Sequence, residues 1–201
     1  MKIIYTIGYS AFDIEHFIAV LKKYKINSLI DVRSQPHSSH YICYNRDNLE
    51  TVMKKNKIIY RNYRDEFGAR QTNEAFYTNG VMDFEKFAMS QQFINGIEKI
   101  KKGIELNYTF VLMCAEKRPE ECHRNILVAR QFFIRGYEIR NIIEDGSFID
   151  QQAIEKILLD KYYPRRDQLS LFDEQLSRDE MIKRSYQKRN EEIGFKWKDL
   201  I

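Results

Sequence analysis

The chain has 201 residues, of which 43% are hydrophobic and 31% are charged, and its formal net charge is +4 at pH 7. This composition is typical of a soluble globular protein that buries a real core. No run of about 18 apolar residues occurs, which excludes a membrane-spanning helix. The mildly basic charge permits contact with phosphates without requiring it.

The N-terminal stretch MKIIYTIGYS carries one Lys and a short apolar run that ends at Gly8, so we expect a first strand and no signal peptide. The three cysteines, Cys43, Cys114 and Cys122, are odd in number and unevenly spaced. Together these features favour the reducing cytoplasm over a disulfide framework.

The chain alternates between the two periods of regular secondary structure. Short β-branched and aromatic runs predict strands at 2–8, 26–33, 57–63, 107–113 and 137–143. Apolar residues at helical spacing predict helices at 12–24, 45–56, 83–103, 123–136 and 149–163. Strands separated by single helices predict a three-layer, Rossmann-like α/β domain with a mostly parallel sheet.

We expect this α/β domain to span residues 1–163, with the apolar strand 107–113 near its centre. The stretch 64–82 has no clear period. After Pro164 the sequence becomes charge-rich, which predicts a polar C-terminal appendage over 164–201. In parallel α/β sheets, ligands bind beyond the carboxyl ends of the strands, so the loops that follow these strands should share one rim.

The segment LMCAEKRPEECHR (112–124) holds the most reactive side chains on this rim. Cys114 ends the predicted strand, and Cys122 precedes the next helix, where amide groups and the helix dipole lower a thiol pKa and favour anions. Glu116 and His123 are candidate acid or base groups, and Arg124 can hold a phosphate or carboxylate.

Other interpretations of this loop stay open. It is similar to the phosphate-binding loops of thiol phosphatases and sulfurtransferases, although it lacks their glycines and Pro119 removes an N–H. A metal site would use Cys114, Cys122 and His123, but the usual C-x2-C pairing is missing, and adjacent Cys and His rarely bind one ion. The cysteines could also be buried small hydrophobes.

Two neighbouring loops add candidate binding residues. In DVRSQPHS, Asp31 and Arg33 alternate with Val32, so their side chains can point to the same side. This loop either binds substrate or is held in place by an Asp–Arg pair. In TIGYS, Gly8 permits a tight turn, which is either structural or presents side chains to a ligand.

Aromatic and basic residues interleave in YRNYRDEFGAR (60–70). Aromatic rings that stack on bases and arginines that hold phosphates are typical of a single-stranded nucleic-acid groove, for which Tyr60, Arg64 and Arg70 are candidates. An amphipathic segment with a buried aromatic face is the equal alternative.

The appendage contains QLSLF (168–172), which resembles the motif by which bacterial DNA polymerases and repair proteins dock on the sliding clamp. Leu171 and Phe172 would enter an apolar pocket, with Gln168 hydrogen-bonding outside it and Leu169 between them. The alternative is a hydrophobic anchor that folds the tail back onto the domain.

Taken in order, YTIGYS, LIDVRSQPHS, YNRDNL, FGAR and LMCAEKRPEECHR resemble the bacterial and archaeal family known as domain of unknown function (DUF) 488, over roughly residues 3–145. The resemblance implies a Rossmann-like domain and a pocket built from these segments. The family's signature positions are Thr6, Gly8, Ser10, Asp31, Arg33, Ser34, Pro36, Ser38, Asn45, Gly68, Arg70, Cys114, Glu116, Cys122, His123 and Arg124. Tyr9, Ile42 and Ala69 depart from the usual His, Pro and Gly.

We therefore predict a cytoplasmic α/β enzyme that acts on nucleic acid or a nucleotide in DNA maintenance, by hydrolysis, glycosidic cleavage or thiol chemistry. Cys114 and Glu116 form the expected reactive pair, and His123 carries protons. The expected substrate-binding residues are Thr6, Gly8, Tyr9, Ser10, Asp31, Arg33, Ser34, Ser38, Arg70 and Arg124.

Two other functions remain open on the sequence alone. One is a non-catalytic module that binds a nucleotide or a nucleic-acid end, and the other is a metal or redox-sensing protein that uses Cys114, Cys122 and His123. The expected partners are nucleic acid or a nucleotide and the DNA sliding clamp, without membrane contact. No cofactor is required by the sequence.

Overall fold

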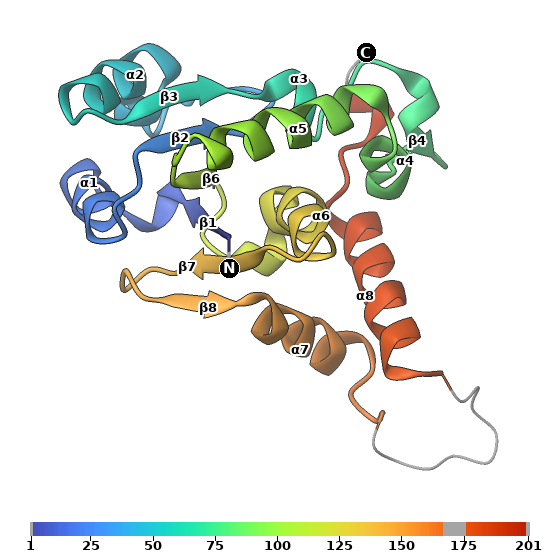
Figure 1. Ribbon diagram of the computed structural model, residues 1–201. Helices are drawn as coiled ribbons and strands as arrows, with labels where there is room; N and C mark the ends of the chain where they lie inside the picture. Colours follow the sequence, from blue (N-terminus) through green and yellow to red (C-terminus); the bar gives the residue numbers. More distant parts are fainter. Residues whose placement is uncertain (1, 167–175, 200–201) are drawn as a thin grey trace.

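The centre of the protein is a six-stranded sheet in the order β3-β2-β6-β1-β7-β8. A computed structural model describes residues 2–166 and 176–199 (Figure 1). Five strands are parallel, and β8 pairs antiparallel with β7. The strands are β1 (Ile3–Gly8), β2 (Ser28–Asp31), β3 (Ile59–Asn62), β6 (Phe110–Cys114), β7 (Glu138–Ile142) and β8 (Phe148–Asp150). The central position expected for strand 107–113 is confirmed, because β6 lies between β2 and β1.

Helices cover both faces of this sheet, so the predicted three-layer α/β fold is confirmed. Alternate side chains of each strand face opposite layers: Tyr5 of β1 packs with α1 and α2, whereas Ile4 packs with α5 and α7. The principal helices are α1 (Ile14–Lys23), α2 (Arg46–Lys55), α5 (Gln91–Glu105), α6 (Arg130–Phe133), α7 (Gln151–Tyr162) and α8 (Arg178–Ile193). In the described part of the chain, no helix has the length and apolarity needed to cross a membrane.

Three predicted helices differ in detail from the structure. The helix expected at 83–103 is two helices, α4 (Phe84–Ala88) and α5, because the Ser90 hydroxyl accepts a bond from the Phe93 amide and starts a new helix. The helix expected at 123–136 opens with a π-helical stretch, Arg124–Ala129, before α6. The start of the helix expected at 149–163 is β8, and Asp150 then caps α7.

The stretch 64–82 is ordered although its sequence shows no clear period. It contains α3 (Arg64–Phe67) and the hairpin of β4 (Tyr77–Thr78) and β5 (Val81–Met82). Asn79 and Gly80 join the two strands with φ values of 50° and 75°. An Asn-Gly pair favours such a left-handed two-residue turn, so this hairpin has a recognisable sequence signal.

The described part of the expected appendage packs onto the α/β domain. Tyr186 of α8 is buried, and its hydroxyl accepts a hydrogen bond from Gln151. The side chain of Asn190 bonds the Phe84 amide and the Met82 carbonyl, and the described residues after α8 lie beside the β4–β5 hairpin, where the Met82 amide donates to the Phe195 carbonyl (Figure 1). Polar composition conceals this packing because only a few residues of α8 reach the core. Residues 168–172, which carry the docking motif, lie outside the described residues.

Candidate active site

A polar pocket of about 340 Å³ lies at the carboxyl ends of β1, β2 and β6, on the rim predicted from the strand order. The loops that follow these strands build most of its wall, and two residues that follow α3 complete one side. Its lining residues are Tyr9, Arg33, Ser34, Gln35, His37, Ser38, Ala69, Arg70, Cys114, Ala115, Glu116, His123, Ile193 and Phe195.

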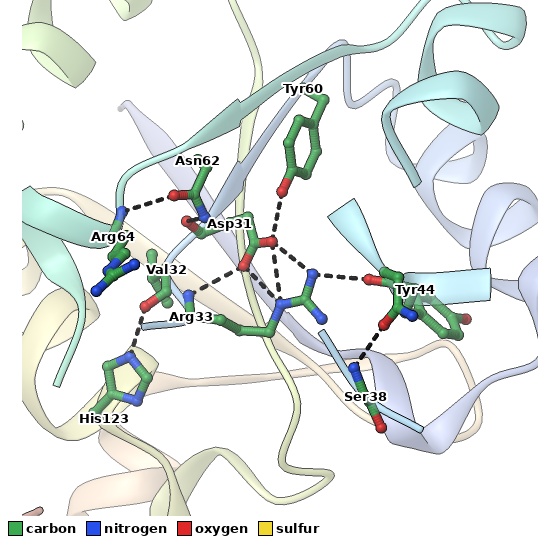
Figure 2. Close-up of polar contacts among 10 residues, drawn as sticks. Asp31, Val32, Arg33, Ser38, Tyr44, Tyr60, Asn62, Arg64 and His123 are labelled. Carbon is green, nitrogen blue, oxygen red and sulfur yellow. Dashed lines mark hydrogen bonds and ion pairs between the residues drawn. The ribbon is translucent and has the colours of Figure 1, made fainter. Parts of the chain in front are cut away.

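A buried ion pair fixes Arg33 in this pocket (Figure 2). The Arg33 Nε and Nη2 atoms donate to the Asp31 carboxylate at 2.9 and 2.6 Å, and Nη2 also donates to the Tyr44 carbonyl at 2.9 Å. Tyr60 donates to the same carboxylate at 2.7 Å. Burial by itself would lower the pKa of Arg33, but the bonds to Asp31 outweigh it and raise the pKa. Asp31 thus orients a permanently charged guanidinium, as the alternation of residues predicts.

One nitrogen of the Arg33 guanidinium, Nη1, makes none of these hydrogen bonds. Arg33 Nη1 is buried and has no hydrogen-bond partner among the residues that the structure describes. The guanidinium carbon lies 5.0 Å from the centre of the Tyr9 ring, which lines the same pocket. A buried charged donor without a partner costs free energy, so an acceptor that reached this nitrogen, after movement of the side chains that now cover it, would bond it.

Four side chains with reactive atoms cluster beside Arg33. The thiol, carboxylate and imidazole atoms of Cys114, Glu116, Cys122 and His123 all lie within 4.8 Å of one another. His123 Nδ1 is 3.8 Å from the Cys114 sulfur and 4.0 Å from the Cys122 sulfur, and the Cys122 sulfur is 2.8 Å from Glu116 Oε2. Cys114, Glu116 and His123 line the pocket, while buried Cys122 stands behind them.

The groups of this cluster shift one another's pKa values. Burial raises the pKa of the Cys114 thiol, and its neighbours Cys122 and Glu116 add to this rise. The pKa of the Cys122 thiol is lowered, because bonds with Cys114 and His123 and the charge of Arg124 outweigh burial. Burial would also lower the pKa of His123, but Cys122 and Glu116 raise it to about 9.

Glu116 keeps its charge although it is partly enclosed. Burial would raise the pKa of its carboxyl, but the charge of His123 and hydrogen bonds from the two thiols lower it to about 2. Burial raises the pKa of Tyr9 as well, with Arg33 opposing the shift, so this phenol retains its proton at neutral pH. The pocket thus combines a carboxylate acceptor with a phenol donor.

Gly8, Ser10 and Arg124 support the loop and do not line the pocket. A Cβ atom on Gly8 would lie 1.9 Å from the Glu116 carbonyl oxygen, so only glycine permits this close approach. Ser10 donates its amide to the Ala115 carbonyl at 3.1 Å. Fully buried Arg124 donates to the carbonyls of Glu116 and Lys117, so it binds the loop instead of facing a ligand.

Thr6 was expected to bind substrate but neither lines the pocket nor supports its loops. It is buried within β1, and its hydroxyl donates to Asn141 at 2.8 Å in a polar network with Asn125 and Gln151. Ser34 and Ser38, both expected to bind substrate, line the pocket. The Ser34 hydroxyl accepts the Arg70 amide at 2.9 Å and so joins two walls.

The interleaved segment 60–70 has its aromatic face buried. Tyr60 and Phe67 are inside the core, so Tyr60 is not available to stack on a base, and exposed Arg64 does not line the pocket. Among the candidates of this segment Arg70 does line the pocket, where its guanidinium lies 4.7 Å from the Phe195 ring and donates to Gln35 at 2.7 Å. The amphipathic alternative therefore describes this segment better than a nucleic-acid groove.

Two residues of the pocket wall come from the end of α8 and the turn that follows it. Ile193 and Phe195 close one side of the pocket, and sequence reasoning missed both. Their segment is charge-rich and lies far along the chain from every other lining residue. Phe195 and Trp197 are too few to form a pattern in such a segment from which a place at the pocket can be read.

The fold and the site together define a Rossmann-like α/β protein with a charged pocket at the carboxyl edge of its parallel sheet. The family described as "Domain of unknown function DUF488" matches residues 13–131, more than half of the chain, and the chain belongs to this family. The match includes the Asp31–Arg33 pair and the whole Cys–Glu–Cys–His cluster, while β1 precedes it. No curated protein and no solved structure matches the chain.

Proposed function

We propose that this protein is an enzyme of DNA maintenance that acts on a phosphate-bearing nucleotide, either free or at the end of a nucleic-acid strand. The observation that carries the proposal is the unpartnered Nη1 atom of buried Arg33, which shares a pocket with the side chains of Cys114, Glu116 and His123. An anionic group on Arg33 would hold the rest of a substrate against these reactive atoms.

The charges of the pocket favour a phosphate. Arg33 is oriented by Asp31 and offers one donor, and Arg70 supplies a second cation from another loop. Guanidinium groups bind phosphate oxygens through short charge-assisted hydrogen bonds. Phe195 places apolar ring surface next to Arg70, which suits a ligand with a flat base.

The clustered side chains favour catalysis over simple binding. Two buried cysteines beside a half-buried histidine and an exposed glutamate, with mutually shifted pKa values, are typical of a functional site. A protein that only binds a phosphate needs the two arginines and has no need of the reactive cluster. We therefore assign the reaction to Cys114, Glu116 and His123, with Tyr9, Arg33, Ser34, Ser38 and Arg70 binding the substrate.

Arg70→Ala tests the binding half of this proposal. Loss of one charge-assisted hydrogen bond of about 1.5–3 kcal/mol should weaken nucleotide binding by at least about tenfold. Isothermal titration calorimetry measures the dissociation constants for nucleoside phosphates and for the matching nucleosides. A 5′-phosphorylated oligonucleotide, titrated in the same way, distinguishes a free nucleotide from a strand end as the substrate. The matched control is Arg64→Ala, because Arg64 is exposed and lies outside the pocket. This variant should bind the nucleotide with wild-type affinity. Equal affinity for nucleosides with and without phosphate would contradict the proposal.

The motif at 168–172 supports a second part of the proposal, docking on the DNA sliding clamp. Replacing Leu171 and Phe172 by Ala removes the two apolar anchors and should abolish binding to a bacterial clamp measured by surface plasmon resonance. Gln175→Ala, just beyond the motif, should leave binding intact. The idea fails if the unmodified protein does not bind the clamp.

A further inference from the structure

We propose that Cys114, Cys122 and His123 bind one zinc ion, with the Glu116 carboxylate beside its fourth coordination position. This deepens the proposed function, since the ion would be the reactive centre of the same pocket. Two thiolate sulfurs and an imidazole nitrogen are the donors that zinc, a borderline-soft cation, prefers. Three protein ligands with an open fourth position are typical of catalytic zinc sites.

The spacing of the donor atoms fits this ion. Zinc binds sulfur at about 2.3 Å and nitrogen at about 2.1 Å, so a tetrahedral site needs sulfur-to-nitrogen separations of roughly 3.6 Å. His123 Nδ1 lies 3.8 Å from the Cys114 sulfur and 4.0 Å from the Cys122 sulfur. Small side-chain rotations close such differences, whereas the backbone already holds the three residues together.

The orientation of His123 is the second, independent feature. Its Nε2 atom is 2.9 Å from the carbonyl oxygen of Val32 in the loop after β2 (Figure 2). A carbonyl only accepts, so Nε2 carries the proton, and in the neutral ring the Nδ1 lone pair faces both sulfurs. Metal-binding histidines are held by this kind of bond to a backbone carbonyl.

Adjacent Cys and His residues rarely bind one ion, but the backbone conformation at Cys122 and His123 allows both side chains to do so here. Cys122 is extended, with φ −131° and ψ 138°, while His123 is already helical, with φ −59° and ψ −25°. In a uniform strand, neighbouring side chains point to opposite faces. The change of conformation between the two residues turns both donors toward Cys114.

The fourth position of the ion would open into the pocket. Cys114, Glu116 and His123 line that pocket together with Arg33, whereas Cys122 is behind them. A water molecule bound there would pass a proton to Glu116, and the resulting hydroxide oxygen would form a bond to the phosphorus atom of the nucleotide's phosphate. The bond to the leaving group breaks, and Glu116 returns the proton to that group, which balances a hydrolysis.

Metal analysis of the purified full-length chain tests the inference without knowledge of the substrate. We expect one zinc per chain, and loss of that zinc in Cys114→Ser, Cys122→Ser and His123→Ala. Cys43→Ser is the matched control, because Cys43 is exposed and outside the cluster, and it should retain full zinc. Glu116→Gln should also retain zinc, and its loss there would overturn the assignment of three ligands.

Cobalt titration of the chelator-treated wild-type protein keeps the test independent of whether the variants fold. Bound cobalt should show thiolate-to-metal charge-transfer absorption, and zinc should displace it. A folded wild-type protein that binds neither ion overturns the inference, and if it still binds nucleotides the proposed function stands. Zinc binding without nucleotide binding would instead support the metal site and contradict the proposed substrate.

Discussion

Asp31→Ala is expected to lower the free energy of unfolding by about 3–5 kcal/mol, because it leaves the Arg33 guanidinium buried without its counter-charge. The two side chains are 5% and 0% exposed and meet at 2.6 Å, so solvent cannot compensate for the missing carboxylate. Tyr60 would also lose the acceptor of its hydroxyl. Urea unfolding monitored by circular dichroism measures the change in stability.

Two further variants separate the ion pair from its surroundings. Tyr60→Phe removes only one hydrogen bond to the carboxylate and should cost about 1.5–3 kcal/mol. Adding Arg33→Met to Asp31→Ala removes the unpaired charge and should recover much of the lost stability, since an apolar residue of similar length replaces a buried ion. An Asp31→Ala protein as stable as the wild type would contradict this description of the pair.

The sheet could be predicted because its strands are apolar runs of recognisable length. β6 is buried along its whole length, and its apolar sequence indicated a central strand. Boundaries set by single capping residues were harder to predict: Ser90 splits one expected helix and Asp150 delays another. Helix α8 escaped detection because it meets the core through a few residues, chiefly Ile182, Tyr186 and Ile193, within an otherwise charged sequence.

The site could be predicted where a strand period or a strand end fixes a side chain's direction. Alternation around Val32 placed Asp31 and Arg33 together, and the end of β6 placed Cys114 on the rim. Arg124, expected to bind substrate, donates instead to the loop carbonyls of Glu116 and Lys117, because an arginine that binds carbonyls looks in sequence like one that binds an anion. Phe195 reaches the pocket through tertiary packing of α8, which no local pattern encodes.

Glu116→Gln is expected to lower kcat by about 10²- to 10⁴-fold while nucleotide affinity changes little, because the amide cannot accept a proton in the reaction. The substitution keeps the side chain's size, and the charge of His123 with the hydrogen bonds from the two thiols lowers the pKa of the wild-type residue, which favours the carboxylate at neutral pH. Steady-state turnover on the tightest-binding nucleotide, together with its dissociation constant, measures the two effects separately.

Glu120→Gln supplies the matched control for this substitution. Glu120 belongs to the same loop but does not line the pocket, so its loss should leave kcat unchanged. Full turnover in Glu116→Gln would remove Glu116 from the reaction, whatever its place in the cluster. A wild-type protein that binds nucleotides tightly but turns none over would instead identify a recognition module, in which Arg33 and Arg70 account for the function and the Cys–Glu–Cys–His cluster only shapes the pocket.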